Sequence, residues 1–297
     1  MDFHFQQRQH RVPKIYLKQF GYLENGIWKI FVVDKVVRSL VTIPIDIFST
    51  AINEFDFPSD NYREKRHFEE TAGKIESLYP MVLSSIKNQK KLTLRHEDIL
   101  RHFAASLIMR SENNRKFFIE LLQHPETRDK FLNEVMMSDE ETPAIAKLAF
   151  IMMNKDEHLP LMQGIITNHL VRILRSFHAV ILQDFNGRSW PVSDEPVCID
   201  FQKNYSWILP VEAELYLPLS PDYCLFLFHP KSQLNSNQLR KLKTNKLHLT
   251  DEETHDGVFK KIVDFSGGKY LIVNNKYRTD FESFWAEMAS NPVSSGN

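Results

Sequence analysis

The spacing of apolar residues predicts a helical middle in this chain, with strand-like segments before and after it. From Tyr62 to Lys87 apolar residues recur at steps of three and four, which is the repeat of one helix face. A second long helix is predicted from Arg95 to His124, with Thr93 as its N-cap. Pro125 ends this helix, and a bend is expected near 111–114. The shorter predicted helices lie at 13–20, 126–137, 142–154, 160–175, 232–243 and 281–289.

Runs rich in β-branched and aromatic residues predict the strands of the chain. These strands lie at 27–33, 36–43, 177–183, 189–199, 215–219 and 224–228. The first two form a small N-terminal hairpin that turns at Asp34–Lys35. The pair Asn186-Gly187 is a hairpin signal between the next two strands. The polar stretch Asp251–Gly257 is predicted to be a mobile loop.

Strands on both sides of a helical middle predict an α+β fold rather than alternating βαβ units. The expected architecture is a mostly helical body with a small N-terminal β-hairpin and a short antiparallel sheet formed from the C-terminal half. All 297 residues are assigned to a single α+β domain. Three lobes are distinguished within it: an N-terminal hairpin segment at 1–60, a helical lobe at 61–176 and a β-containing lobe at 177–297.

Composition excludes several nucleotide-binding and hydrolase classes. The chain has only 9 glycines but 22 phenylalanines among its 297 residues. It contains no G-x-G-x-x-G, no G-x-x-x-x-G-K-[ST] and no G-x-S-x-G, so the dinucleotide fingerprint, the Walker phosphate loop and the nucleophile elbow are absent. A site in this chain is therefore expected to consist of side chains on helices and strand ends, rather than of a backbone cradle.

Charge and cysteine usage indicate a cytoplasmic protein without a membrane partner. The 37 basic and 38 acidic residues leave a net charge of −1, without the overall basic excess of many nucleic-acid binders. Basic runs at 87–95 and 240–246 either follow a nucleic-acid backbone or form solvated faces. Cys198 and Cys224 cannot form a zinc quartet and fit a reducing compartment. No apolar run approaches the ~18 residues of a spanning helix.

Arg110 is the first candidate functional residue. It lies on the apolar stripe of the second long helix together with Phe103 and Leu107. A buried arginine requires an anionic partner. Glu69 and Glu76 are seven residues apart on one side of the first long helix and can supply it. Two interpretations stay open: an arginine–glutamate pair that joins two helices, or a site where the glutamates bind a metal or a proton and the arginine grips an anionic substrate.

Asp194 and His10 are the other candidates. Asp194 follows a predicted strand in Ser193-Asp194-Glu195-Pro196, where it forms either an ordinary Asx-type turn or a metal ligand or general base. His10 precedes the helix that begins at Pro13, and acts either as a capping group or as an acid or base near neutral pH. The established metal patterns HExxH, CxxC and the EF-hand loop are missing.

The opening His10-x-Val12-Pro13-x-x-Tyr16-Leu17-x-x-Phe20 resembles that of a largely bacterial family known only as domain of unknown function 4238. Further segments similar to this family are the strand 27–35, Glu69 with Glu76, Phe103–Arg110, Ser193–Val197 and Leu217–Pro221. The chain departs from the family pattern at Phe177-His178, where the family tends to carry tryptophan, and at Glu195, where it often carries asparagine. The resemblance spans 8–230. It implies that His10, Glu69, Glu76, Arg110 and Asp194 belong to one set, which a shared pocket would explain.

The leading hypothesis is a hydrolase of phosphodiester or nucleotide substrates, metal-dependent or acid–base, such as a nuclease-like effector in bacterial defence. Its catalytic set is His10, Glu69, Glu76, Arg110 and Asp194. Glu69, Glu76 and Asp194 are assigned as ligands of a divalent metal or as bases. His10 is assigned as a general acid or base, and Arg110 as the group that stabilises phosphate charge. The expected partner is a nucleic acid or a nucleotide.

Two alternatives come from other functional classes. In the first, the chain is a non-catalytic ligand-binding or sensor module, and the charged set is a buried structural network. In the second, the chain is a helical protein that self-associates through phenylalanine-rich helices. Metal binding and the thermal stability of glutamate and arginine variants distinguish the hydrolase from the network, and light scattering tests self-association.

Overall fold

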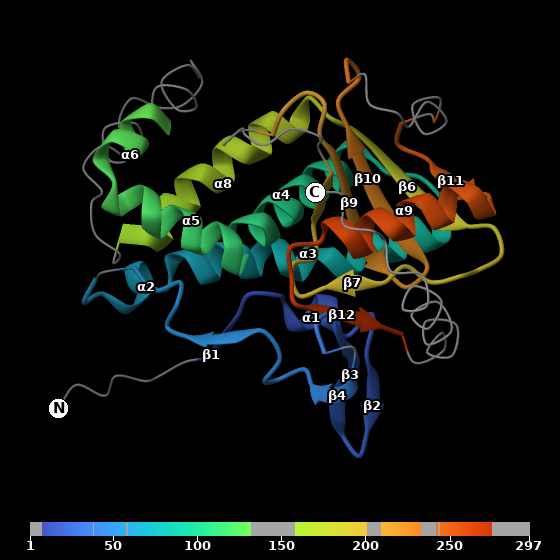
Figure 1. Cartoon of the computed structure of the whole chain (residues 1–297), viewed down its shortest axis with the longest axis horizontal. Helices are drawn as coiled ribbons and strands as arrows, with labels where there is room; N and C mark the ends of the chain where they lie inside the picture. The colour runs from blue at the N-terminus through green and yellow to red at the C-terminus, as the bar shows by residue number, and fades with distance from the viewer. Residues whose placement is uncertain are drawn as a thin grey trace.

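The computed structural model describes residues 8–37, 39–57, 59–131, 158–200, 209–232, 242 and 244–274. In Figure 1 most helices lie at the left and centre, helix α9 lies at the right, and most strands lie at the right and below. The described helices are α1 (Lys14–Leu17), α2 (Tyr62–Lys65), α3 (His67–Gln89), α4 (Leu94–Met109), α5 (Glu112–Gln123), α6 (Pro125–Phe131), α8 (Leu159–Arg175) and α9 (Glu252–Phe265). The helices predicted at 142–154 and 281–289 lie outside the described residues, as do most of 232–243 and part of 126–137.

The long helices α3, α4 and α8 pack together, and α4 contacts both of the others. Residues Leu100, Phe103, Ala104 and Ala105 of α4 are almost completely buried. A helix that is apolar on several sides needs neighbours on those sides, which explains its central position. Thr93 caps α4 as predicted, because its side chain accepts the backbone N–H of His96.

The second predicted long helix is interrupted. It ends at Met109, and α5 begins after Ser111. The Ser111 side chain accepts the backbone N–H of Asn114, and the Asn114 amide donates to the Ile108 carbonyl. These bonds satisfy polar groups at both helix ends, so the bend expected near 111–114 is a break with its own caps. The break leaves Arg110 at the end of α4.

A five-stranded sheet with the order β11-β6-β10-β9-β8 forms the centre of the C-terminal part. Only the β11–β6 pair is parallel among the pairs in this sheet. The strands are β6 (His178–Asp184), β8 (Cys198–Asp200), β9 (Glu214–Ser220), β10 (Tyr223–Phe228) and β11 (Leu247–Thr250). The strands predicted at 177–183, 215–219 and 224–228 are thereby confirmed.

Both faces of this sheet are covered. On one face Ile181, Leu217 and Leu225 belong to the core that includes α3, α4 and α8. On the other face Leu182 and Phe226 pack against Ile262 of α9. Successive side chains of a strand point to opposite faces, so each strand contributes to both layers. The result is a sheet between a layer of long helices and the single helix α9, which crosses it in Figure 1.

A second five-stranded sheet joins the two ends of the described chain. Strand β3 (Ile27–Asp34) pairs with β2 (Tyr22–Glu24), with β4 (Leu40–Pro44) and with β12 (Tyr270–Val273), which pairs with β7 (Val192–Ser193). A further small sheet pairs β1 (Arg8–His10) with β5 (Thr50–Ile52). The predicted N-terminal hairpin is therefore present as β3–β4. The expectation of a mostly helical body with one short C-terminal sheet is wrong, because the described residues form three sheets.

The predicted hairpin at Asn186-Gly187 is also wrong. Gly187 does adopt a left-handed turn conformation, with φ 73°. However, β6 pairs with β10 and β11, and the next strand, β7, joins the other sheet. Pro191 and Pro196 lack the N–H groups that a long returning strand would need, so the predicted strand at 189–199 is reduced to β7 and β8.

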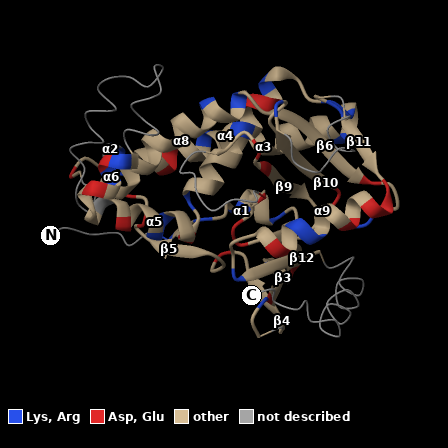
Figure 2. Cartoon of the chain, turned by 45° about the horizontal axis from the view of Figure 1, so that its top comes forward, with Lys and Arg blue, Asp and Glu red and all other residues tan. Residues whose placement is uncertain are grey.

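Residues 251–257 form a helix start rather than the predicted mobile loop. The Asp251 side chain accepts the backbone N–H of Thr254, and Glu252 and Glu253 follow in the first turn of α9. Acidic residues at a helix N-terminus interact favourably with the helix dipole. Figure 2 shows these acidic positions at one end of α9 and basic positions in its middle. His255 and Val258 are buried, so packing against the sheet also holds this turn in place.

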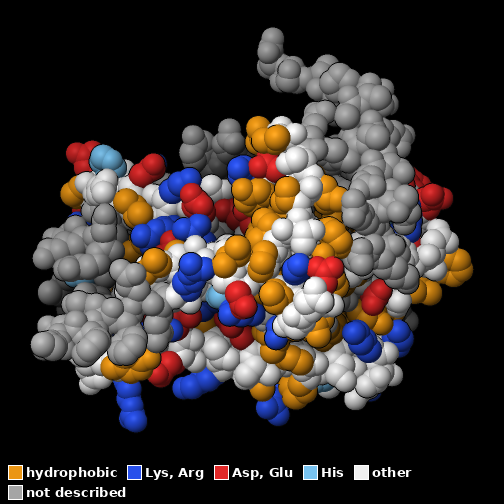
Figure 3. Space-filling model, turned by 90° about the horizontal axis from the view of Figure 1, so that it is seen from below, with side chains coloured by type: hydrophobic (Ala, Val, Ile, Leu, Met, Phe, Trp, Pro, Cys, Tyr) orange, Lys and Arg blue, Asp and Glu red, His pale blue; other side chains and the backbone are white. Residues whose placement is uncertain are grey.

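Apolar side chains reach the surface at the β2–β3–β4 end of the molecule. Leu23, Ile27 and Val41 of these strands are exposed, as are Val36 and Val37 in the β3–β4 turn. Figure 3 views the molecule from this side and shows hydrophobic side chains interspersed with charged ones. Exposed single apolar residues are common on folded proteins, so this surface by itself indicates no partner.

Candidate functional site

Arg110 is the centre of a buried cluster between α3, α4 and β1. Its side chain is 2% exposed, and Nη1 donates to Oε1 of Glu76 at 2.8 Å while Nη2 donates to Oε1 of Glu69 at 3.0 Å. Nη1 also donates to the backbone carbonyl of His10 at 3.2 Å. The structure thus brings together the two helix glutamates and the arginine, and it adds His10 through its carbonyl group.

Two phenylalanine rings enclose the guanidinium group. Cζ of Arg110 lies 5.2 Å from the ring centroid of Phe55 and 5.5 Å from that of Phe68. The two rings are themselves stacked, with centroids 5.4 Å apart. A desolvated cation over aromatic rings is stabilised by the ring quadrupole. Arg110 is therefore held both by two carboxylates and by two aromatic rings.

The glutamates differ from the arginine in their access to solvent. The side chains of Glu69 and Glu76 are 18% and 21% exposed, so each can contact molecules in solution. Burial raises the pKa of Glu76, the negative charge of Glu69 acts in the same direction, and the positive charge of Arg110 opposes both. Glu76 is consequently easier to protonate than an ordinary solvated glutamate.

The surroundings of His10 favour the neutral form of its imidazole. Burial lowers its pKa, and the positive charges of Lys14 and Arg110 lower it further, whereas Asp46 opposes them. Its Nε2 atom is buried and has no hydrogen-bond partner among the described residues. His10 therefore does not act as the capping group of α1, for which no side-chain cap is present.

Ion pairs and hydrogen bonds that the sequence did not reveal extend this cluster. Arg11 is bound to Glu54 and Glu112, and Glu54 also pairs with Arg115 of α5. The buried Gln9 donates to Asp56 at 2.6 Å. These contacts fasten the N-terminal segment to the helices. The only signal for them in the sequence is the charged run beside His10, and such runs are usually solvated.

Asp194 belongs to a different cluster, at the end of β7. Its Oδ1 accepts the backbone N–H of Tyr270 at 2.8 Å and the hydroxyl hydrogen of Ser193 at 3.4 Å. Burial raises the pKa of Asp194, and the backbone N–H groups of Tyr270 and Lys269 oppose that change. A Cβ atom on Gly268 would overlap Asp194 and Ser193. Within the motif the local turn bond is made by Ser193, whose hydroxyl accepts the backbone N–H of Glu195 at 2.8 Å. The Asp194 carboxylate instead holds the start of β12, so the Asx-type turn predicted for Asp194 is not the bond that forms.

The structure does not join the five predicted site residues. No hydrogen bond or ion pair within the described chain connects Asp194 to His10, Glu69, Glu76 or Arg110. The described residues also contain no group of three or more histidine, cysteine, aspartate or glutamate side chains that could hold a metal ion. At Glu69 and Glu76, the guanidinium of Arg110 already supplies the positive charge between the carboxylates. The assignment of Glu69, Glu76 and Asp194 as metal ligands therefore gains no support.

Two cavities lie on opposite sides of the C-terminal half of α4. One, of about 160 Å³, is lined mainly by Leu107, Ile108, Ser111, Asn113, Glu195 and Gly267. Burial raises the pKa of Glu195, whose carboxylate accepts hydrogen bonds from the backbone and the side chain of Asn113. Because Glu195 is already bonded to the chain, this cavity offers few free polar groups.

The other cavity, of about 240 Å³, lies between α3, α4 and α8. It is lined by Phe57, His67, Phe68, Thr71, Ala72, Ile75, His102, Ser106, Leu161, Gly164, Ile165, Thr167 and Asn168. Ser106 precedes Arg110 by one helical turn on the same face of α4. Phe68 both lines this cavity and stacks on Arg110. The cavity and the arginine cluster therefore share a wall.

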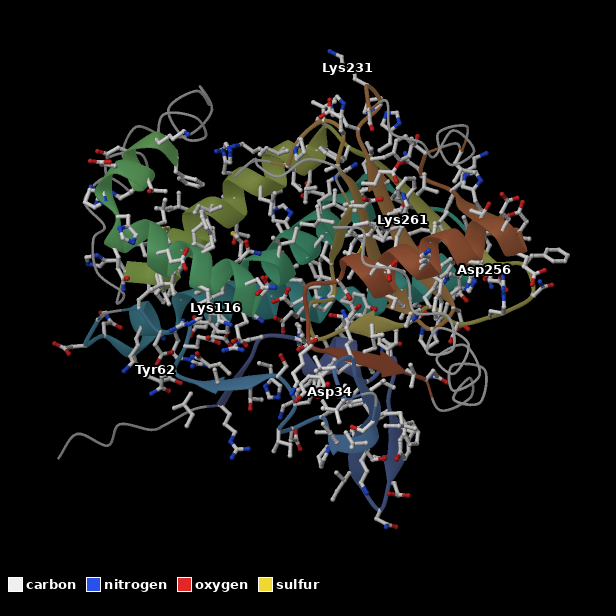
Figure 4. All side chains as sticks on the ribbon, in the orientation of Figure 1. Asp34, Tyr62, Lys116, Lys231, Asp256 and Lys261 are labelled. Carbon is white, nitrogen blue, oxygen red and sulfur yellow. The ribbon has the colours of Figure 1, made fainter. Side chains whose placement is uncertain are left out.

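A second buried ion cluster joins α9 to the central sheet. Nζ of Lys261, labelled in Figure 4, lies 2.8 Å from both Asp200 and Glu214. Glu214 is 1% exposed and also accepts the hydroxyl hydrogen of Tyr216. No motif in the sequence marks these residues, because they lie in three separate elements.

The fold and the site define an α+β protein with a buried arginine–glutamate centre between two helices. The chain belongs to the family described as protein of unknown function (DUF4238), whose model matches residues 8–269. This match confirms the resemblance noted from the sequence and extends it beyond residue 230. No curated protein and no solved structure matches the chain. Within the described residues, no helix combines the length and the apolar character needed to cross a membrane.

Proposed function

We propose that this protein is a non-catalytic ligand-binding or sensor module, in which the cavity between α3, α4 and α8 receives a small molecule and the Arg110 cluster is a structural network. The observation that carries this proposal is the position of Phe68. The ring of Phe68 forms part of the cavity wall, and the guanidinium of Arg110 contacts the same ring. A ligand in the cavity would therefore press on a wall that the charged network holds in place.

The bonding of Arg110 supports a structural role for the charged set. Three of the five N–H groups of a guanidinium are used by Glu69, Glu76 and the His10 carbonyl. Nε of Arg110 has no partner among the described residues, but it is buried, so a substrate phosphate would have to enter the closed cluster to reach it. The network instead links β1 to α3 and α4, which suits a rigid frame around a binding site.

The cavity has the character of a small-molecule site. Such sites are concave, mostly apolar and carry a few polar groups, with typical volumes of about 300–1,000 Å³. At about 240 Å³ this cavity is slightly smaller than that range, so it suits a small ligand of one or two rings. It also lies between rigid helices, which is a common location for ligand sites in helical layers.

A screen of fragment-sized molecules by ligand-detected NMR tests this proposal. The Gly164→Leu variant provides the specificity control, because a Cβ at Gly164 meets Phe68 at an ordinary 3.8 Å and the rest of the side chain would fill the cavity. Gly73→Leu is the matched variant, since Gly73 lies on α3 and has no atom within 4 Å of its Cβ position. We expect fragments that bind the wild type and Gly73→Leu but not Gly164→Leu. The absence of any such fragment would refute the proposal.

A hydrolase of nucleotide or phosphodiester substrates is the second candidate, and the Glu69–Glu76 pair favours it. Both side chains are partly exposed and flank the same guanidinium, and burial raises the pKa of Glu76. A carboxyl group with a raised pKa beside a second carboxylate is the pattern of a general acid and a general base. In this candidate Glu76 donates a proton, Glu69 accepts one, and Arg110 orients both. The partner would be a nucleotide or a nucleic acid, and a nuclease-like role in defence belongs to this candidate alone.

Activity measurements separate the two candidates. The wild type is assayed with nucleoside mono- and diphosphates and with a single-stranded oligonucleotide, in the presence of Mg²⁺, of Mn²⁺ or of a chelator. Hydrolysis that Glu76→Gln abolishes, while its melting temperature stays close to that of the wild type, establishes the hydrolase. Absence of turnover under all conditions, together with the fragment binding described above, leaves the binding module.

A further inference from the structure

We infer that the cavity between α3, α4 and α8 selects an uncharged, planar heteroaromatic ring of the size of a nucleobase or nicotinamide. This inference rests on the proposed binding function and adds the chemical class of the ligand. It is drawn from three properties of the cavity wall: its aromatic rings, its unused polar groups and its lack of charge.

Aromatic rings at one end of the cavity favour a flat ligand. Phe57, His67 and Phe68 all line the cavity, and the rings of Phe57 and His67 are in tilted contact with centroids 5.9 Å apart. On its other side Phe68 is stacked against Phe55 and Arg110, so it cannot turn away freely. Aromatic pairs prefer offset-stacked or edge-to-face arrangements, and a planar ligand ring can form these with a fixed wall.

Polar groups with unused hydrogen-bonding capacity favour a heteroaromatic ring over a hydrocarbon. The side chains of Thr71, Ser106 and Asn168 line the cavity and have no hydrogen-bond partner among the described residues. Thr71 and Asn168 are exposed, so they lie where the cavity opens to solvent. Thr167 provides a contrast, because its hydroxyl donates to the Gln163 carbonyl at 2.7 Å. Hydroxyl and amide groups both donate and accept hydrogen bonds. They match the alternating donors and acceptors on the edge of a nucleobase or of nicotinamide.

The absence of fixed charge favours an uncharged ligand. The described residues that line the cavity include no aspartate, glutamate, lysine or arginine. A charged group that leaves water for such a site loses hydration without gaining a counter-charge, which is costly. Arg110 lies behind Phe68 and is already neutralised by its two glutamates, so it offers no compensation.

Four probes test the ligand class, and they vary the charge of the ring and the presence of polar groups on its edge. Nicotinamide and adenine are uncharged heteroaromatic rings, nicotinate is the charged counterpart of nicotinamide, and toluene is a ring without polar edges. Binding is measured by ligand-detected NMR and by titration calorimetry. We expect nicotinamide or adenine to bind at least ten times more tightly than nicotinate and toluene.

Three variants locate the binding site. Gly164→Leu should reduce affinity for the bound heteroaromatic probe at least tenfold, and Gly73→Leu should leave it unchanged. Asn168→Ala should weaken that probe while leaving the weaker affinity for toluene as it is. Melting temperatures of all three variants show whether each is folded.

The outcomes distinguish this inference from the proposed function. If toluene or nicotinate binds best, and Gly164→Leu removes that binding, the ligand class is wrong but the cavity is a binding site. If the heteroaromatic probes bind equally to Gly164→Leu and the wild type, they bind elsewhere and the inference is overturned. If neither these probes nor any library fragment binds, both the inference and the binding function are wrong.

Discussion

Arg110 and Glu76 form an ion pair of 2.8 Å between two helices, although they are 34 residues apart in the chain. The arginine side chain is almost completely buried, whereas the glutamate is partly exposed. The Arg110 end of the pair is therefore shielded from water by aromatic rings, and the Glu76 end is accessible to solvent.

Arg110→Met should strongly destabilise the protein. The substitution retains much of the side-chain volume but leaves Glu69 and Glu76 without their cation, and breaking a buried pair costs about 3–5 kcal/mol. Urea unfolding measures this change. Arg175→Met is the matched control, because Arg175 pairs with Asp98 at the surface with a side chain that is 54% exposed, and such pairs contribute about 0–1 kcal/mol. Equal losses in the two variants would contradict a structural role for the Arg110 cluster.

The contribution of His10 to stability should depend on pH. Burial and the charges of Lys14 and Arg110 lower its pKa in the folded state, so the folded protein favours the neutral imidazole. Such a group contributes stability that is present above its unfolded-state pKa and is lost as pH falls through the folded-state pKa. The unfolding free energy of the wild type relative to His10→Gln should thus be constant above about pH 6.5 and decrease below it.

Unfolding in urea between pH 8 and pH 5 measures this difference. His124→Gln serves as the control for the substitution itself, because His124 is exposed. An increase in the relative stability of the wild type on acidification would show that His10 gains an anionic partner instead.

Gly268→Ala should destabilise the protein by about 1–3 kcal/mol, the usual cost of an overpacked site. The new Cβ would overlap the Asp194 carboxylate and the Ser193 hydroxyl. Gly257→Ala is the control, because Gly257 lies in α9 and has no atom within 4 Å of its Cβ position. That variant should gain about 0.5–1 kcal/mol from helix propensity. The double variant Gly268→Ala/Asp194→Ala should be more stable than Gly268→Ala alone, because it removes the overlapping carboxylate. If it is not, the proposed contact is wrong.

Lys261→Met should destabilise the protein by about 3 kcal/mol, because it leaves Asp200 and Glu214 without their shared cation. Thermal unfolding measures the loss. Adding Glu214→Gln to this variant should recover part of it, since the neutral amide is less costly to bury than an unpaired carboxylate. Lys260→Met, next to it on the exposed side of α9, should have little effect. A double variant less stable than Lys261→Met would refute the pairing.

Helix-based predictions were correct where the relevant contacts follow from local spacing. The stripe that contains Phe103, Leu107 and Arg110 is a property of α4 itself, and Glu69 and Glu76 share one side of α3 for the same reason. Packing two such stripes together brings the charged groups face to face. The interruption after Met109 was only partly predicted, because the side chains of Ser111 and Asn114 that create it also occur within continuous helices.

Predictions that required long-range contacts were less successful. The grouping of Asp194 with Arg110 came from resemblance, and the structure places Asp194 beside Gly268 and Tyr270 instead. The Asn186-Gly187 turn was identified, but the strand after it joins another sheet. The Lys261 cluster was missed, because Asp200 and Glu214 lie on strands that only become neighbours in the folded chain.

The sequence by itself determined the helices α3 and α8, the strands β3, β4, β6, β9 and β10, the absence of glycine-rich phosphate loops, and Glu69 and Glu76 as candidate partners of Arg110. Each of these depends on spacing within one element or on residue type alone. Only the tertiary structure decided that Arg110 pairs with these glutamates, that β3 pairs with β12, that Asp194 holds Tyr270, and that Phe68 separates Arg110 from a cavity. Strand pairing uses backbone groups that every residue carries, and a cavity depends on packing between α3, α4 and α8, so neither has a signature in the order of residues.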